Sequence, residues 1–314
     1  MTLAITSRRR RWVIVAVVGA VAIVAAVLIA RGLRDSSNTA AFFAAFPGVT
    51  ELPIDAPVGF PAWLSWSHAL NAFFLVFIVR SGLLVRSKVR PPAFVTRTAG
   101  PKSASRPPQR QSLHVWWHLV VDTLFVLNGV FYLVLLFATG QWVRVVPLGW
   151  DVVPNAVSAA VQYLSFDWPV HNGWVHYNAL QLLFYFATVF IAGPLALLTG
   201  LRLAPGWPAG PRWAGINRVF SEGRARSIHF GVLVYYIGFT VIHVVLIFAT
   251  GALRNLNHMY AGRDDETWIG AAVWAGTFVL MVVGFLVVTP RLQSWIAQLG
   301  NDVRRMPTPP AARK

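Results

Sequence analysis

Two histidines, His229 and His243, lie fourteen residues apart in an otherwise apolar stretch. An α-helix rises 1.5 Å and turns 100° per residue, so this spacing separates the two imidazoles by about 21 Å and leaves them within about 40° of one face. One helix would therefore present two imidazoles to the same interior at two depths. This arrangement suits two stacked haems, each bound by one histidine from this helix and one from another.

Three further histidines are candidate partners at matching depths. His68 lies near the start of one apolar stretch, on the side of the membrane expected for His243. His114 and His118 lie near the start of the next stretch, level with His229. We expect two b haems with two histidine ligands each. One would take His68 and His243, and the other would take His229 with His118 or His114. His118 lies deeper in its stretch, and depth favours it.

Other polar groups in the apolar stretches are candidates for supporting roles. Asp122 lies one helical turn beyond His118, where a charge is costly and usually functional. It is a candidate for orienting an imidazole N–H or for carrying protons, and an uncharged interhelical hydrogen bond is the alternative. Arg80 is a candidate partner for a haem propionate, or it extends to the membrane surface. Remaining candidates are Arg144 and Arg254 for the outer haem, Asn71 and Asn128 for hydrogen bonds between helices, and His171, His176 and His258 as interfacial residues.

The absence of cysteine limits the chemistry. The sequence contains none, which excludes disulfides, thiolate-bound iron–sulfur clusters and the C-x-x-C-H attachment of c-type haem. The G-x-G-x-x-G, Walker A and H-E-x-x-H patterns are also missing, so nucleotide chemistry and zinc hydrolysis have no support. A cofactor held here would be bound without thiolates.

The composition indicates a membrane protein that crosses the bilayer several times. Of the 314 residues, 56% are hydrophobic and 12% are charged, and the mean hydropathy is +0.57. Six stretches are long enough to cross a bilayer as helices: 12–30, 64–85, 113–139, 174–200, 228–250 and 268–288. The predicted fold is an all-α membrane protein with six transmembrane helices and a four-helix di-haem bundle at its core.

The net charge of +16 has a distribution that indicates orientation rather than nucleic-acid binding. With the N-terminus in the cytoplasm, the inner segments hold 21 of the 27 Lys and Arg residues. This bias predicts insertion in the cell membrane with both termini cytoplasmic, and contact with membrane lipid. We expect no nucleic-acid partner.

The chain divides into four parts on this reading. Residues 1–31 form an N-terminal signal-anchor helix, with cleavage as the alternative. Residues 62–252 form the cytochrome b core, 268–290 an additional transmembrane helix, and 291–314 a basic cytoplasmic tail that we expect to be disordered. The polar, proline-containing loop 87–112 is expected to be flexible, and the tryptophan-containing loop 141–173 is expected to form a structured outer cap.

Several short motifs accompany the histidines. His68 is followed thirteen residues later by Ser81-Gly82, "YNALQ" begins at Tyr177, and the fourteen-residue histidine pair follows. With these features, residues 62–252 resemble the di-haem cytochrome b family that includes the formate dehydrogenase gamma subunit and the nickel–iron hydrogenase b-type cytochrome. The stretches "HALNAFFLVFIVRSG" and "VLIFATGALRNLNHMYAG" look like cytochrome b/b6-domain proteins found with molybdopterin oxidoreductases.

The resemblance implies a function in electron transfer. Such subunits pass electrons between a quinone pool and a redox partner, here expected to be a molybdopterin oxidoreductase. The resemblance places the quinone near His68, His243 and Asn178. In "LHVWWH" the family position favours His114 as ligand, whereas depth favours His118. The extra first span, together with the charge bias, inverts the core relative to formate dehydrogenase and leaves open the side that faces the partner.

Two other hypotheses use the same residues. A stand-alone haem enzyme would reduce or oxidise a quinone, ferric iron or superoxide itself. A haem-free transporter or scaffold would use the histidines and Asp122 for protons, although the inverted repeats and broken helices common in transporters are not evident.

Overall fold

The computed structural model describes residues 2–87, 89–97, 109–168, 173–208 and 210–306, and side chains from residue 9 onward. The chain is 73% helical, and six helices are long and apolar enough to cross a membrane. They are α1 (Thr2–Asp35), α3 (Ala62–Arg86), α4 (Leu113–Ala138), the continuous rod of α6 (Ala179–Phe186), η2 (Ala187–Ala192) and α7 (Gly193–Leu203), α9 (Glu222–Ala249), and α11 (Ile269–Val287). The prediction of six long apolar helices is therefore confirmed.

Local capping sets where several of these helices begin. The hydroxyls of Ser112 and Ser221 accept the backbone N–H groups of Val115 and Arg224 at the starts of α4 and α9. Asn178 and Gln181 form a reciprocal capping box at the start of α6. A cap satisfies amides that would otherwise lack a partner. This explains why α6 begins at Ala179, later than the hydrophobic pattern alone predicts.

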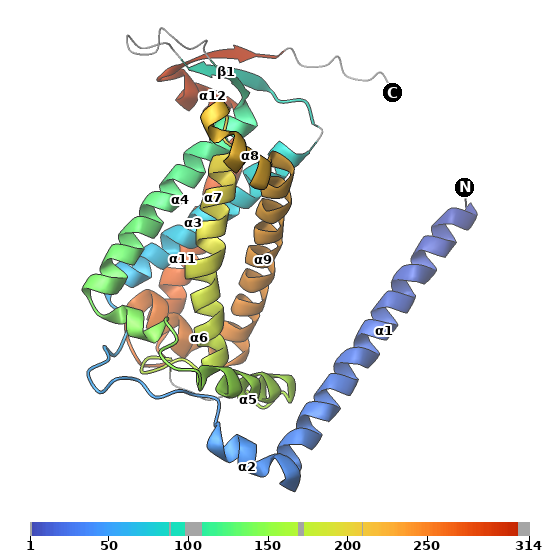
Figure 1. Cartoon of the computed structure of the whole chain (residues 1–314), viewed down its shortest axis with the longest axis vertical. Helices are drawn as coiled ribbons and strands as arrows, with labels where there is room; N and C mark the ends of the chain where they lie inside the picture. The colour runs from blue at the N-terminus through green and yellow to red at the C-terminus, as the bar shows by residue number, and fades with distance from the viewer. Residues whose placement is uncertain (1, 88, 98–108, 169–172, 209, 307–314) are drawn as a thin grey trace.

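Five of the long helices lie side by side, and α1 stands apart (Figure 1). α3 packs along α4, and α7 packs along α9, whereas close backbone approaches between α4 and α9 are sparse. α1 is held mainly through α2 (Ser37–Ala45) and α5 (Val152–Leu164). Arg31 and Arg34 of α1 both bind Ser165, directly after α5, and Arg34 also binds Asp167.

A small sheet closes one end of the molecule, which we call the sheet end. β1 (Ala93–Arg97) pairs antiparallel with β2 (Arg110–Ser112) and with β3 (Asn301–Arg305), and α12 (Pro290–Gln298) precedes β3. Ala93 and Val95 of β1 are fully buried with Leu113 and Ala297. The expectations of a flexible 87–112 loop and a disordered tail are therefore wrong for these elements. Residues 98–108 and 307–314 lie outside the described part.

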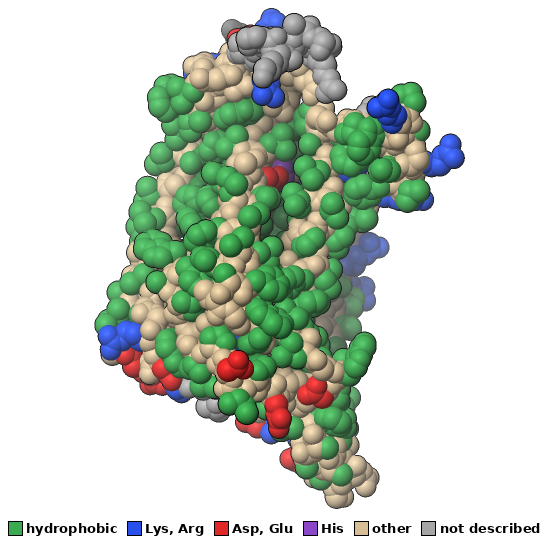
Figure 2. All heavy atoms as spheres, turned by 60° about the vertical axis from the view of Figure 1, so that its left-hand side comes forward, with side chains coloured by type: hydrophobic (Ala, Val, Ile, Leu, Met, Phe, Trp, Pro, Cys, Tyr) green, Lys and Arg blue, Asp and Glu red, His purple; other side chains and the backbone are tan. Residues whose placement is uncertain are grey.

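Short helices cover the opposite end, which we call the α5 end. The 141–173 segment, predicted to form a structured cap, contributes η1 (Gln141–Arg144) and α5. α10 (Ala252–Leu256) and η4 (Asn257–Ala261) precede α11 here, while η3 (Pro211–Trp213) and α8 (Ala214–Val219) lie before α9 at the sheet end. Figure 2 shows a broad hydrophobic surface between the two ends, with acidic side chains gathered at the α5 end.

Candidate functional site

Four of the predicted histidines meet in two pairs. His118 of α4 faces His229 of α9, and His68 of α3 faces His243 of α9. The ring centres are 6.3 Å apart in each pair. Because α9 runs unbroken from Glu222 to Ala249, the two pairs lie about 21 Å apart along one helix. We call them the sheet-end pair and the α5-end pair.

The ring separation matches two imidazoles that share one metal ion. A metal-bound imidazole nitrogen lies about 2 Å from the ion and the ring centre about 1.1 Å farther, so two rings on opposite sides have centres about 6.2 Å apart. Each pair in this chain has 6.3 Å. In the described residues, no group of three or more His, Cys, Asp or Glu side chains could hold a metal ion. A bis-histidine haem needs only two protein ligands, because the porphyrin supplies the other four.

Hydroxyl groups fix the rings of the sheet-end pair. Nδ1 of His118 lies 2.8 Å from Oγ of Ser81, and Nδ1 of His229 lies 2.8 Å from Oγ1 of Thr199. Each hydroxyl donates its own hydrogen to a backbone carbonyl one turn earlier, that of Phe77 or Leu195. The hydroxyl oxygens therefore accept from the imidazoles, which places the hydrogen on Nδ1 and leaves the Nε2 lone pair for a metal.

A glycine follows each of these hydroxyl residues and lets the imidazole approach closely. A Cβ on Gly82 would lie 3.3 Å from Cε1 of His118, and one on Gly200 would lie 3.7 Å from Cε1 of His229. The first distance is tighter than ordinary carbon contact. The sheet-end pair is thus held by two matching elements, Ser81-Gly82 on α3 and Thr199-Gly200 on α7.

Aromatic side chains surround the α5-end pair. Phe239 stacks on His243 with ring centres 5.4 Å apart, and Tyr185 approaches the same ring edge-on at 6.1 Å. Tyr260 approaches His68 edge-on at 5.9 Å. The buried Nδ1 of His68 has no hydrogen-bond partner among the described residues. The α5-end pair is therefore enclosed by aromatic rings, whereas the sheet-end pair is fixed by hydroxyl groups.

Asp122 lies beside Nε2 of His118, the ring nitrogen that does not contact Ser81. Its Oδ2 is 3.4 Å from Nε2 of His118, and the orienting contact to Nδ1 comes from Ser81 instead. Asp122 thus approaches one ring nitrogen of His118 and Ser81 the other. It places a polar group next to the space between the two imidazoles.

The structure separates the two candidates for the fourth ligand. His118 faces His229, whereas His114 lines a cavity between α3, α9 and the start of α12. The geometry favours His118. Arg80 lines the same cavity, donates to the carbonyl of Phe285 (2.6 Å) and lies over the Phe285 ring. Its guanidinium is bound to α11 rather than to the histidine pairs.

The polar residues expected near the outer haem have structural partners at the α5 end. The side chain of Asn178 caps α6 and donates to the hydroxyl of Tyr163 (2.9 Å). Arg144 is buried and donates to the carbonyls of Gly59, Gly173 and Trp174. Arg254 binds Asp264. Between α3 and α4, the side-chain amide of Asn128 donates a hydrogen bond to Asn71, as expected for these two residues.

The interfacial histidines lie away from the two pairs. His258 is buried against Phe60 and Trp174 and binds Asp264, and His176 contacts the carbonyl of Thr50. Both lie at the α5 end, as expected. His171 lies outside the described residues.

Sequence reasoning did not single out Thr199 and Gly200. A signal was present, because "TG" at 199–200 repeats the hydroxyl–glycine order of "SG" at 81–82. Tyr185 and Tyr260 were equally hard to separate from ordinary packing residues.

No family model matches the chain, and neither the curated proteins nor the solved structures include a match.

Proposed function

We propose that this chain is a transmembrane cytochrome b that carries electrons between a quinone and a partner oxidoreductase. The observation that supports it most is the repeated geometry: two imidazole pairs, each 6.3 Å between ring centres, share one unbroken helix. His118 and His229 would hold one b haem, and His68 and His243 the other. Haem iron with two histidine ligands exchanges single electrons between its ferric and ferrous states.

The chain's own side chains would set the properties of these centres. Ser81 and Thr199 would orient the ligand rings and raise their basicity. Phe239, Tyr185 and Tyr260 would keep water from the α5-end pair. Axial ligands, hydrogen bonding and burial are the means by which a protein tunes haem potential.

The partners follow from the resemblance. Chemistry on the final substrate would belong to a separate redox subunit, with a molybdopterin oxidoreductase as our proposal. A quinone would bind near the α5-end pair and Asn178. The charge bias supports a cell-membrane protein with its sheet end and both termini in the cytoplasm.

A second candidate is favoured by one contact. Asp122 lies 3.4 Å from His118, within a membrane-spanning helix, and such carboxylate–histidine pairs also serve in proton pathways. A haem-free, proton-linked transporter would use this pair directly. A purified, folded protein without haem would support it.

Haem counting in single-histidine variants tests the proposal. His118→Leu and His229→Leu should each lose the same haem, and His68→Leu and His243→Leu should each lose the other. His114→Leu and His176→Leu are matched controls and should keep both. A full haem complement in any of the four ligand variants would overturn the assignment for that pair.

A further inference from the structure

A cavity beside the sheet-end pair has no role in the ligation scheme. Its volume is about 850 Å³, within the range of ligand-binding pockets. α3 and α9 form most of its walls, and α11, the start of α12 and the segment after α3 complete them. None of the four paired histidines lines it. Ser81, which holds His118, lies about 150° around α3 from the centre of the cavity-lining face.

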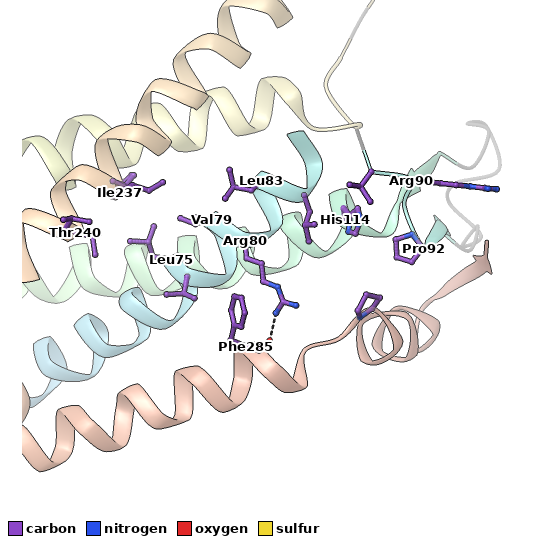
Figure 3. A pocket seen from close by; sticks show the side chains of 16 residues that line it. Leu75, Val79, Arg80, Leu83, Arg90, Pro92, His114, Ile237, Thr240 and Phe285 are labelled. Carbon is purple, nitrogen blue, oxygen red and sulfur yellow. Dashed lines mark hydrogen bonds between the residues drawn. The ribbon is translucent and has the colours of Figure 1, made fainter. Parts of the chain in front are cut away.

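The lining is mostly apolar, with Arg80 partway along it and with His114 and Arg90 at one end. Figure 3 shows Leu75, Ile237 and Thr240 at one end, with His114, Arg90 and Pro92 at the other. The polar end is the sheet end. An occupant would therefore have a long apolar part directed into the membrane and a compact polar part beside His114.

His114 is the group that distinguishes this cavity from ordinary lipid-facing surface. It is buried, with 8% of its surface exposed, and it lines the cavity. No hydrogen bond to either ring nitrogen is found among the described residues. A buried imidazole without a partner is costly, and a ligand oxygen in the cavity would remove that cost.

We propose that this cavity binds an isoprenoid quinone, with a ring oxygen hydrogen-bonded to His114 and the prenyl tail along Leu75, Val76 and Val241. The choice of quinone rests on the proposed electron-transfer function. Of the two lining arginines, Arg80 is already bound to the carbonyl of Phe285, whereas Arg90 lies at the polar end, so competition by anionic phospholipid is one of the outcomes that the test below must separate. The site differs from the quinone position at the α5 end that the family resemblance implies. Its polar residue, His114, lies one helical turn, about 6 Å, before His118 on α4.

Photolabelling with an azido-quinone tests this site without relying on activity. The full chain is reconstituted in quinone-free liposomes, labelled with and without decylubiquinone or menaquinone-4 as competitor, and mapped by mass spectrometry. We expect competed label on residues 75–84 and 236–241. His114→Leu should need about tenfold more competitor, and His114→Gln, whose amide can replace the hydrogen bond, should stay within about threefold.

A second variant keeps the test decisive if His114→Leu does not fold. Val79→Trp should fill the cavity and abolish the label, while Val134→Trp on the exposed face of α4 should leave it unchanged. Label confined to α5-end peptides, or competed by anionic phospholipid instead of quinone, would overturn the inference. Loss of a haem in Val79→Trp alone would assign the cavity to porphyrin and would also overturn it.

Haem content of the same preparations separates this inference from the proposed function. Competed label in a protein without haem would leave the quinone site standing and refute the cytochrome. Two haems without cavity labelling would refute only the site.

Discussion

The hydroxyl groups of Ser81 and Thr199 are the residue-scale feature with the clearest consequence. Each accepts a hydrogen bond from Nδ1 of one ring of the sheet-end pair. Ser81→Ala and Thr199→Val remove these acceptors, and loss of such a partner typically lowers metal affinity about 10–100-fold. We expect faster haem loss from this pair to apomyoglobin. Ser87→Ala, whose exposed hydroxyl donates to the carbonyl of Leu84 and to no other group among the described residues, should be indistinguishable from wild type. Equal release rates in all variants would contradict the assigned role.

Gly82 offers an independent steric test of the same pair. Even a single Cβ there would lie 3.3 Å from His118, so Gly82→Val should displace the imidazole and remove one haem of the two. Gly231→Val on α9 is the matched control, because nothing lies within 4 Å of its Cβ position. Absorbance spectra and haem counts measure the difference. A normal count in Gly82→Val would exclude close packing of His118 against α3.

Helical periodicity and depth in the membrane predicted the two histidine pairs, apart from the choice between His114 and His118. His229 and His243 share a face because fourteen residues make nearly four turns. Periodicity could not choose between His114 and His118, which are one turn apart on α4 and differ by their neighbours on α3. Thr199 was missed for a similar reason, since its partner His229 lies on another helix, and only packing brings the two together.

At the scale of elements, we expect His258 in the π-helix η4 to make the α5 end sensitive to pH. Burial lowers the pKa of His258 from its ordinary value, and the nearby cations Arg254 and Arg144 act in the same direction. The hydrogen bond to Asp264 opposes these effects. Below a pH of about 6.5, His258 therefore takes up a proton more readily in the unfolded chain than in the folded one. The folded α5 end loses stability as the pH falls.

Hydrogen exchange measures this loss. Peptides covering 257–272 should exchange faster at pH 5 than at pH 7, after correction for the intrinsic rate. His258→Phe keeps an aromatic ring against Phe60 and Trp174 but cannot titrate, so its corrected rates should depend less on pH. The same pH dependence in both proteins would assign the effect to other groups.

The sheet is the element that sequence reasoning described wrongly. "AFVTR" has three apolar residues followed by two polar ones and shows no apolar–polar alternation, its surroundings are polar and rich in proline, and its partner β3 lies about 200 residues farther on. Composition reports local tendencies, whereas this sheet depends on distant pairing and on burial of Ala93 and Val95 against α4 and α12.

Val95→Asp tests whether the sheet is a folded unit. An unpaired charge at this fully buried position should cost roughly 3–5 kcal/mol and open the sheet. Limited proteolysis by thermolysin should then cut within 87–112 and 290–305 more rapidly. Arg97→Asp, at the exposed end of the same strand, is the control and should resist cleavage as wild type does. Equal resistance of Val95→Asp would mean that the sheet contributes little to the fold.

At the scale of the whole molecule, hydropathy predicted all six long helices because each must present about 20 apolar residues to lipid. It could not predict that α1 would stand apart from the others (Figure 1), since apolar composition does not specify which helices pack together. The short α5-end helices depend on contacts such as those of buried Arg144, which hydropathy would place in solvent.

Orientation is testable because the sequence has no cysteine. A single Ser87→Cys at the sheet end should resist a membrane-impermeant maleimide in intact cells and react after permeabilisation. Asp55→Cys at the α5 end should react in intact cells. The opposite pattern would place the sheet end outside and contradict the orientation drawn from the charge bias.

The haem content of the wild-type chain tests the central claim most directly. The purified protein, its haem measured by pyridine haemochrome and its iron by electron paramagnetic resonance, should contain two low-spin b haems per chain. A well-folded protein with no haem would contradict the cytochrome proposal and leave the proton-linked alternative.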